Sequence, residues 1–156
     1  MIELRVRQAK SDDLSDIYRI EQTFGAGAFS KRSLRRLLSK TIVVDYDGVI
    51  AYCTYFQFKK TVKIYNIAVD SRCRNQGLAR KLLKEVEDIS QQSQKENIML
   101  EVAADNIPAK TLYESLGYET IKLLDDYYGD GELVSASTVL YKHATDLFFQ
   151  MKGQWL

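Results

Sequence analysis

The sequence has few of the residues that build metal sites and disulfide frameworks. Its 156 residues include only two cysteines, Cys53 and Cys73, and one histidine, His143. Structural zinc sites use several Cys and His ligands, so no metal site is expected here. A catalytic Cys–His or Ser–His pair is also not expected, and Cys73 is interpreted as an ordinary loop thiol. Two thiols without a disulfide pattern are typical of the reducing cytoplasm, which is the predicted location.

The sequence also lacks an excess of charge of one sign and a long hydrophobic run. It has 22 basic and 21 acidic side chains, so bulk charge gives no reason to expect a nucleic-acid partner. No apolar run approaches the ~20 residues that span a bilayer. The opening "MIELRVRQAK" has no basic-then-apolar order of a signal peptide. We therefore expect neither nucleic-acid binding nor membrane association.

What is present favours one mixed α/β domain. Hydrophobic residues make up 46% of the chain, enough for a core, and the length favours a single domain. We predict a domain over residues 1–143 and an amphipathic tail over residues 144–156. Alternating or β-rich runs predict strands in 1–9, 41–58 (a hairpin around "DYDG"), 61–69, 97–103, 118–124 and 133–142. Helical spacing and caps predict helices from Ser11 or Asp12, from Ser30, from Leu78 to about Ser90, and from Asn106 to Gly117.

The segment "RCRNQGLARKLL" combines a glycine, several basic residues and the start of a predicted helix. The first turn of a helix has amide groups without intrahelical partners and a partial positive charge. Gly77 removes a side chain at this point, so the local chemistry fits a phosphate or a pyrophosphate. The alternative is an ordinary strand-to-helix connection that needs a glycine for its turn. The spacing matches neither a Walker loop nor a dinucleotide motif.

Two blocks of the sequence together resemble a known family. "NIAVDSRCRNQGLARKLL" is similar to the acetyl-coenzyme A signature Q/R-x-x-G-x-G/A of the GCN5-related N-acetyltransferases (GNAT), with Arg74, Gly77 and Ala79 at its fixed positions. "LEVAADNIPAKTLYESLGYE" and "DDYYGDG" resemble the ribosomal-protein alanine N-acetyltransferase (RimI) type. The resemblance covers roughly residues 3 to 142. It implies the GNAT fold, a mixed but mostly antiparallel sheet of six or seven strands with about four helices.

The resemblance also implies a binding site for acetyl-CoA as cosubstrate. Ile67, Ala68 and Val69 would pair their backbone with the pantetheine arm, and Asn106 would hydrogen-bond the cofactor. Seven consecutive residues would hold the pyrophosphate: Arg74, Asn75, Gln76, Gly77, Leu78, Ala79 and Arg80. The acceptor would lie against Phe29, Tyr127 and Tyr128.

The implied reaction is direct attack of a primary amine on the thioester. The amine must be neutral, and Glu101 would accept its proton as general base. The departing thiolate needs a proton, and Tyr113 would act as general acid with a hydroxyl of pKa near ~10. A backbone N–H near Val69 would stabilise the carbonyl oxygen. Each residue also has a plain structural interpretation: Glu101 as the solvent-facing member of a strand, Tyr113 as a core aromatic, and Asn106 as a helix cap.

The acceptor half departs from the RimI type. "GAGAFS" stands where a Pro-Trp pair is usual, and Ala103 follows L-E-V in place of arginine. A protein N-terminal α-amine is the first choice of acceptor; a small amine, a polyamine or a lysine side chain are alternatives. A non-catalytic acyl-CoA-binding module is the alternative from another functional class. The sequence is compatible with a monomer or a homodimer.

Overall fold

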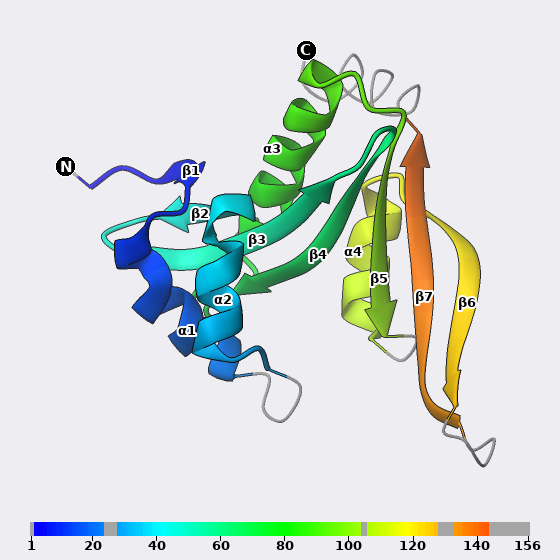
Figure 1. Ribbon diagram of the computed structural model, residues 1–156, viewed down its shortest axis with the longest axis horizontal. Coiled ribbons are helices and arrows are strands. Elements are labelled where there is room, and N and C mark those ends of the chain that lie inside the picture. Colours follow the sequence, from blue (N-terminus) through cyan, green and yellow to red (C-terminus); the bar gives the residue numbers. More distant parts are fainter. Residues whose placement is uncertain (1, 24–27, 104–105, 128–132, 144–156) are drawn as a thin grey trace. The chain divides into compact units, whose positions relative to one another are not determined.

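The computed structural model describes residues 2–23, 28–103, 106–127 and 133–143 (Figure 1). Within these residues it has four α-helices: α1 (Leu14–Gln22), α2 (Lys31–Leu37), α3 (Leu78–Gln92) and α4 (Ile107–Ser115). The strands are β1 (Arg5–Gln8), β2 (Thr41–Asp45), β3 (Val49–Gln57), β4 (Thr61–Val69), β5 (Asn97–Ala103), β6 (Glu119–Tyr127) and β7 (Leu133–His143). The predicted tail over residues 144–156 lies outside the described residues.

The strands form one sheet in the order β1-β2-β3-β4-β5-β7-β6. Strands β1, β2 and β3 pair antiparallel, as do β5, β7 and β6, while β4 and β5 pair parallel. The predicted mixed, mostly antiparallel sheet is therefore confirmed. The chain divides into two compact units, which are described separately: unit 1 is residues 1–56 and 65–89, and unit 2 is residues 57–64 and 90–156.

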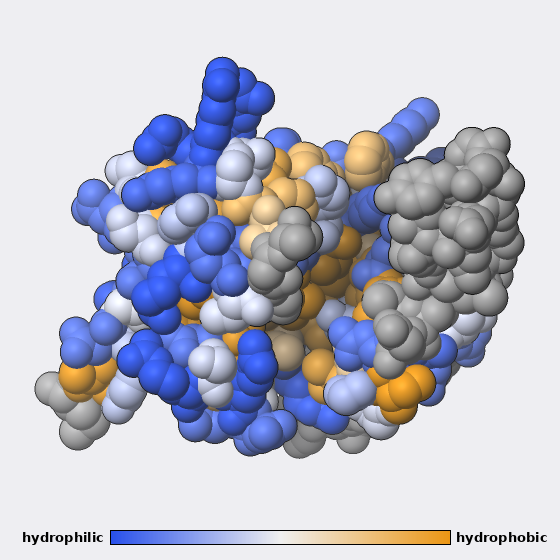
Figure 2. Space-filling view, turned by 90° about the horizontal axis from the view of Figure 1, so that it is seen from below, coloured by the Kyte–Doolittle hydropathy of each residue, from blue (hydrophilic) through white to orange (hydrophobic). Residues whose placement is uncertain are grey.

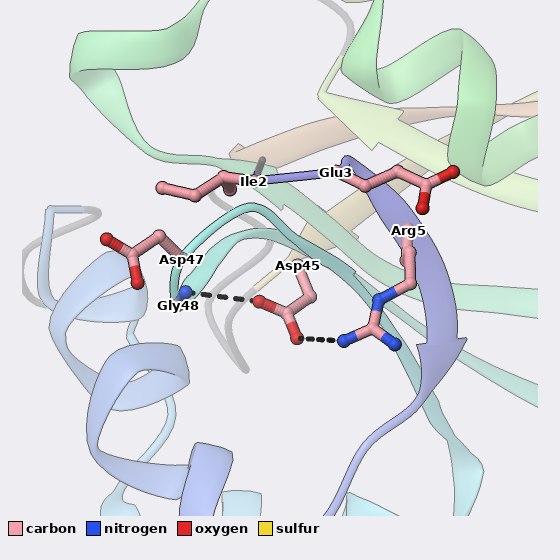
Figure 3. Close-up of a pocket in the computed structure, with 6 residues that line it drawn as sticks. All are labelled: Ile2, Glu3, Arg5, Asp45, Asp47 and Gly48. Carbon is pink, nitrogen blue, oxygen red and sulfur yellow. Dashed lines mark hydrogen bonds and ion pairs between the residues drawn. The ribbon is translucent and has the colours of Figure 1, made fainter.

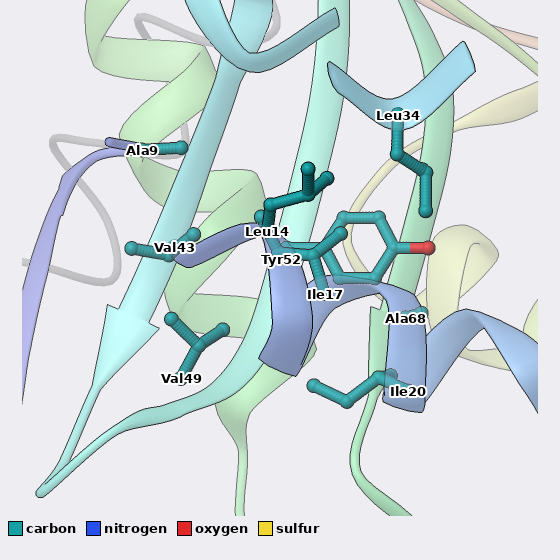
Figure 4. Packing of buried hydrophobic residues seen from close by; sticks show 9 residues of the cluster. All are labelled: Ala9, Leu14, Ile17, Ile20, Leu34, Val43, Val49, Tyr52 and Ala68. Atoms are coloured by element: carbon teal, nitrogen blue, oxygen red, sulfur yellow. The ribbon is translucent and has the colours of Figure 1, made fainter. Parts of the chain in front are cut away.

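The core of unit 1 lies between α1 and α2 and the strands β2 to β4. Buried residues of the cluster are shown in Figure 4, where the ring of Tyr52 lies among aliphatic side chains. Leu14, Ile17 and Ile20 bring the apolar side of α1 onto this cluster and are at most 6% exposed. On α3, helical spacing predicts a stripe of Leu78, Leu82, Val86 and Ile89 with Leu83 beside it; these residues are buried except Ile89, which is half-buried. Helical periodicity thus identified the faces that pack inward.

The start of α1 differs from the prediction. Neither Ser11 nor Asp12 caps the helix; both lie in a short 3-10 turn, and Asp13 precedes the first residue of α1. Asp13 accepts hydrogen bonds from the Lys10 amide (2.7 Å) and from both terminal nitrogens of Arg7 (2.8 and 2.9 Å). The guanidinium lowers the pKa of the Asp13 carboxyl. Asp13 makes no capping bond to the amides of α1, and its carboxylate is held instead by Arg7 of β1 and by the Lys10 amide.

Other local signals are confirmed. Ser30 caps α2 through its hydroxyl, which accepts from the Ser33 amide at 3.1 Å. The "DYDG" turn joins β2 to β3, and Gly48 has a φ of +110° that favours glycine. The first strand is shorter than predicted, because β1 begins at Arg5 and Ile2 is 51% exposed.

Unit 2 is built on β5, which lies between β4 and β7. Residues Thr61–Ile64 of β4 pair with Asn97–Leu100 of β5, and β7 pairs with β5 on one side and β6 on the other. Ile98 and Leu100 are buried. As predicted, Asn106 caps α4, and Gly117 follows its end with a φ of +91°.

The surface is mainly hydrophilic on the face shown in Figure 2, where blue areas surround the orange ones. Among the residues whose side chains the structure describes, the exposed large hydrophobic ones are spread along the chain: Ile2, Tyr46, Phe58, Tyr65 and Ile107. Among the helices that the structure describes, none combines the length and the apolar character needed to cross a bilayer.

Candidate active site

The predicted site residues are divided between the two units. Unit 1 contains Phe29, the strand segment Ile67–Val69 and the loop segment Arg74–Arg80; unit 2 contains Glu101, Asn106, Tyr113 and Tyr127. Tyr128 lies outside the described residues. Each group is described within its own unit.

The predicted pyrophosphate loop is open to solvent and leads directly into α3. Residues 74–77 are exposed, and Leu78 anchors the helix start in the core. The amide of Lys81 donates to the Gly77 carbonyl at 3.1 Å, so the amides of Leu78 and Ala79 lie before this first turn closes. A Cβ built on Gly77 would meet nothing within 4 Å. This open, amide-rich helix start fits an anionic diphosphate.

Backbone conformation explains the glycine in this loop. Gly77 has a φ of +79° and Asn75 a φ of +63°, two left-handed residues within three positions. Glycine adopts such angles without strain, and asparagine tolerates them better than most residues do. Gly77 therefore has two effects: it adopts the positive φ of the turn, and its lack of a side chain leaves the space beside the loop open.

Asp70 fixes the entrance to the loop. Its buried carboxylate accepts from Arg19 Nη1 (2.7 Å) and from Arg72 through Nη2 (2.9 Å), Nε (3.1 Å) and the backbone amide (3.0 Å). These bonds hold the pKa of the Asp70 carboxyl well below its usual range. Arg72 is one of the basic residues of "RCRNQGLARKLL", whose charges the sequence suggests for a phosphate. The structure instead binds Arg72 to Asp70.

Replacing Asp70 by asparagine is expected to lower the free energy of unfolding by about 1–3 kcal/mol at pH 7, because hydrogen bonds to a charged group are lost. The pKa of the folded carboxyl is depressed, so its stabilisation exists above the unfolded value near ~3.9 and declines as the pH falls below it. Urea unfolding at pH 7 and pH 3 measures this, and the difference between wild type and Asp70→Asn should shrink at pH 3. The exposed Asp47→Asn variant is the control, and an Asp70→Asn loss independent of pH would contradict the ionic role.

Unit 1 brings the predicted acceptor residue Phe29 onto β4. The rings of Phe29 and Tyr65 lie with centroids 5.3 Å apart, and Phe56 meets Tyr65 edge-on at the same distance. Tyr65 is 46% exposed and Phe29 is half-buried. Tyr65 comes two residues before the segment Ile67–Val69 that is predicted to pair with pantetheine. The predicted acceptor and cofactor elements therefore meet at this part of β4.

Glu101 lies on β5 directly after Leu100, the last residue paired with β4. Its side chain is 43% exposed and its Oε1 accepts from Lys63 Nζ at 3.3 Å. An exposed pair of this kind contributes only about 0–1 kcal/mol. The Glu101 carboxylate can therefore exchange Lys63 for another partner at little cost, as a general base must.

The other predicted residues of unit 2 have clear structural roles. Tyr113 is 6% exposed, and its ring packs against that of Tyr118 with centroids 6.0 Å apart. Asn106 uses its amide oxygen to cap α4, at 3.3 Å from the Ala109 nitrogen. Tyr127 is the last residue of β6. The expected structural interpretations of Glu101, Tyr113 and Asn106 are thus all present, and their roles toward a ligand remain predictions.

Sequence reasoning missed a buried polar cluster in unit 1. Glu21, on α1, is 3% exposed, and its Oε2 accepts from the Tyr52 hydroxyl and from Asn66 Nδ2 (2.9 Å). Asn66 also donates to the Tyr52 oxygen at 2.9 Å, and Glu21 Oε1 accepts from the Phe29 amide at 3.1 Å. Burial and the bond to Glu21 raise the pKa of Tyr52 above its usual range. The signal available in the sequence was a single acidic residue next to Ile20 on the buried face of a helix.

A separate cavity of about 490 Å³ lies beside the β2–β3 turn and contains none of the predicted site residues. Its lining residues are Ile2, Glu3, Arg5, Asp45, Asp47 and Gly48 (Figure 3). Asp45 is already bound by Arg5, by Arg7 and by the Gly48 amide. Within the described ranges there is no group of three or more His, Cys, Asp or Glu side chains that would hold a metal ion.

Comparisons with known proteins identify the family of the fold. Residues 8–118 match the model of the Acetyltransferase (GNAT) family. The chain is 30% identical over 132 residues to the ribosomal protein bS18 alanine N-acetyltransferase of Haemophilus ducreyi, covering 82% of this chain and 88% of that protein.

Solved structures show the same fold. The ribosomal-protein-S18-alanine N-acetyltransferase from Escherichia coli superposes with a TM-score of 0.80 at 25% identity, covering 91% of this chain and 94% of the other. NAA60 of Arabidopsis thaliana, solved with acetyl-CoA, superposes with a TM-score of 0.76 at 16% identity over 90% of this chain and 99% of the other. The predicted GNAT fold is confirmed, and the chain belongs to the GNAT family of acetyltransferases.

Proposed function

We propose that this acetyltransferase uses acetyl-CoA to acetylate the N-terminal α-amine of a protein, most directly a ribosomal protein that begins with alanine. The observation that carries the acceptor is the similarity, over most of both chains, to an enzyme named for alanine acetylation of ribosomal protein bS18. A ribosomal-protein acceptor places the reaction in the cytoplasm.

The cosubstrate assignment is supported by the start of α3. The amides of Leu78 and Ala79 and the side chain of Arg74 would bind the diphosphate, in the open space beside Gly77. The edge of Ile67–Val69 would bind the pantetheine amides. Asn106 would contribute its Nδ2, because its Oδ1 caps α4.

The proposed chemistry needs only side chains and backbone amides of this chain. Glu101 takes the proton from the α-amine, whose pKa near ~8 makes a carboxylate an adequate base. The amine nitrogen bonds to the thioester carbon, and the amide of Val69 donates to the carbonyl oxygen as it gains charge. The carbon–sulfur bond then breaks, the nitrogen loses its remaining extra proton to solvent, and Tyr113 supplies a proton to the departing thiolate and regains one from solvent. The products are the acetylated amine and the free thiol.

An acceptor screen tests the proposal. Synthetic peptides beginning with Ala, Ser, Met or Lys, spermidine, and an N-terminally blocked lysine peptide are each incubated with acetyl-CoA, and thiol release is measured. We expect the Ala-initiated peptide to react at least ~10-fold faster than the blocked lysine peptide and spermidine. A matched Ala peptide with an acetylated N-terminus is the control and should release no thiol above background. Faster release with spermidine would contradict the proposal and favour the small-amine alternative.

A further inference from the structure

The polar cluster of Glu21, Tyr52 and Asn66 accepts a hydrogen bond from the backbone amide of Phe29, the predicted acceptor residue of unit 1. The two carboxylate oxygens of Glu21 have different partners. Oε2 faces the strands, where it accepts from Tyr52 on β3 and Asn66 on β4, and Oε1 accepts from the Phe29 amide in the segment that leads into α2. One carboxylate thus connects α1, two strands and the α1–α2 segment.

Burial of the Glu21 carboxylate costs free energy of hydration. A carboxylate that is 3% exposed loses most of its hydration and is tolerated only when hydrogen bonds replace it. Buried ionic groups contribute little net stability compared with apolar residues of similar size, although removing one partner is damaging. A purely structural contact between α1 and the sheet would be served by the aliphatic residues already packed there, Leu14, Ile17 and Ile20. The cluster is therefore better explained by a need to fix the residues bonded to it in accurate positions.

The residues bonded to the cluster position two aromatic rings, those of Phe29 and Tyr65. Its bond to the Phe29 amide fixes the backbone of Phe29, and its bond to Asn66 fixes the strand residue next to Tyr65. The Phe29 and Tyr65 rings lie 5.3 Å apart with an angle of 30° between their planes. Tyr65 is 46% exposed, so the pair presents an apolar surface to a ligand. Both rings depend on the same carboxylate for their relative position.

We propose that Glu21 is a positioning residue for acceptor binding, which holds the Phe29–Tyr65 ring pair as the surface that receives the first side chains of the acceptor peptide. The inference rests on the proposed function, because it assumes a peptide acceptor. Glu21 itself does not contact the acceptor, since its oxygens are taken up by Tyr52, Asn66 and Phe29.

The Glu21→Gln variant separates positioning from a general structural role. The glutamine oxygen can still accept from Tyr52 and Asn66. Its NH₂ group then points toward the Phe29 amide, so two hydrogen-bond donors face each other there and the bond is lost. We expect the KM for the Ala-initiated peptide to rise at least ~10-fold, with kcat and the KM for acetyl-CoA within about twofold of wild type. In a Phe29→Ala background the same change should add less than about twofold, because the ring that the bond to the Phe29 amide positions is absent there. Additive effects in this double-mutant cycle would overturn the proposal.

Two further variants complete the test. Asp13→Asn removes another buried carboxylate of unit 1, bound by Arg7 rather than by Phe29, and should lower the melting temperature without changing the peptide KM. Tyr65→Ala changes an exposed side chain, so it should fold even if Glu21→Gln does not, and it should raise the peptide KM at least ~3-fold. An unchanged peptide KM in Tyr65→Ala would contradict the proposal.

A measurement without turnover distinguishes failure of this inference from failure of the proposed function. Hydrogen exchange of the Phe29 amide in the ligand-free protein should be at least ~10-fold faster in Glu21→Gln than in wild type, while amides of α3 remain unchanged. If the amide responds and no peptide is acetylated by wild type, then the anchor exists and the peptide acceptor is wrong. If the amide does not respond, the anchor itself is refuted whatever the acceptor.

Discussion

Replacement of Glu101 by glutamine is expected to reduce kcat/KM for the acceptor peptide by roughly 10²–10⁴-fold at pH 7, the usual contribution of a general base. Glutamine keeps the size of the side chain and removes its ability to take a proton. The loss should become smaller at pH 9, because more of the acceptor α-amine, with a pKa near ~8, is already neutral. Steady-state thiol release at a series of pH values measures the effect.

Glu96 offers a matched control for this experiment. It lies just before β5, is 63% exposed, and pairs with Lys60 at 3.9 Å, much as Glu101 pairs with Lys63. Glu96→Gln removes the same charge from the same unit and should change kcat/KM by less than about twofold. A loss for Glu101→Gln that is constant from pH 7 to pH 9, or equal to that of Glu96→Gln, would refute the base role.

Introduction of aspartate at Gly77 is expected to weaken coenzyme A binding at least ~100-fold. The new side chain would extend into the open space where the diphosphate is proposed to bind, and two like charges in close contact cost several kcal/mol. Aspartate is among the residues that best tolerate positive φ, so the turn at +79° should be kept. Titration calorimetry with coenzyme A at 50 mM and 500 mM NaCl measures the affinity.

Gly77→Asn is the matched control, because asparagine has nearly the same shape and backbone preference without the charge. It should weaken binding several-fold less than Gly77→Asp at low salt, and the two variants should approach each other at high salt as the repulsion is screened. Equal affinities of Gly77→Asp and wild type would show that the diphosphate does not bind at the start of α3.

Local sequence signals account for most of the fold. The Asp-Gly turn, the Ser30 cap, the stripe of α3 and Gly117 after α4 each depend on neighbours within a few residues, and the structure confirms them. The open glycine loop was found in the same way, because its amides, glycine and basic residues are consecutive. Such features are set by backbone geometry and helix periodicity, which a single sequence displays directly.

The features that were missed depend on contacts between distant residues. Glu21 meets Tyr52 and Asn66 across 31 and 45 positions, and Asp70 meets Arg19 across 51. Nothing in the spacing of these residues distinguishes a buried partner from a solvated surface charge, so the cluster under Phe29 and the bond from Arg19 to Asp70 became visible only in the structure.

The edge of the sheet at β1 has a consequence for association between chains. This strand has only four residues, of which Arg5 is exposed and Arg7 is engaged by Asp13 and Asp45. A strand from another molecule could add here only by bringing its backbone against guanidinium groups over a very short length. Short, charged edges of this kind prevent sheets from extending into neighbouring molecules. The β1 end of the sheet is thereby protected from strand addition and from the aggregation that follows it.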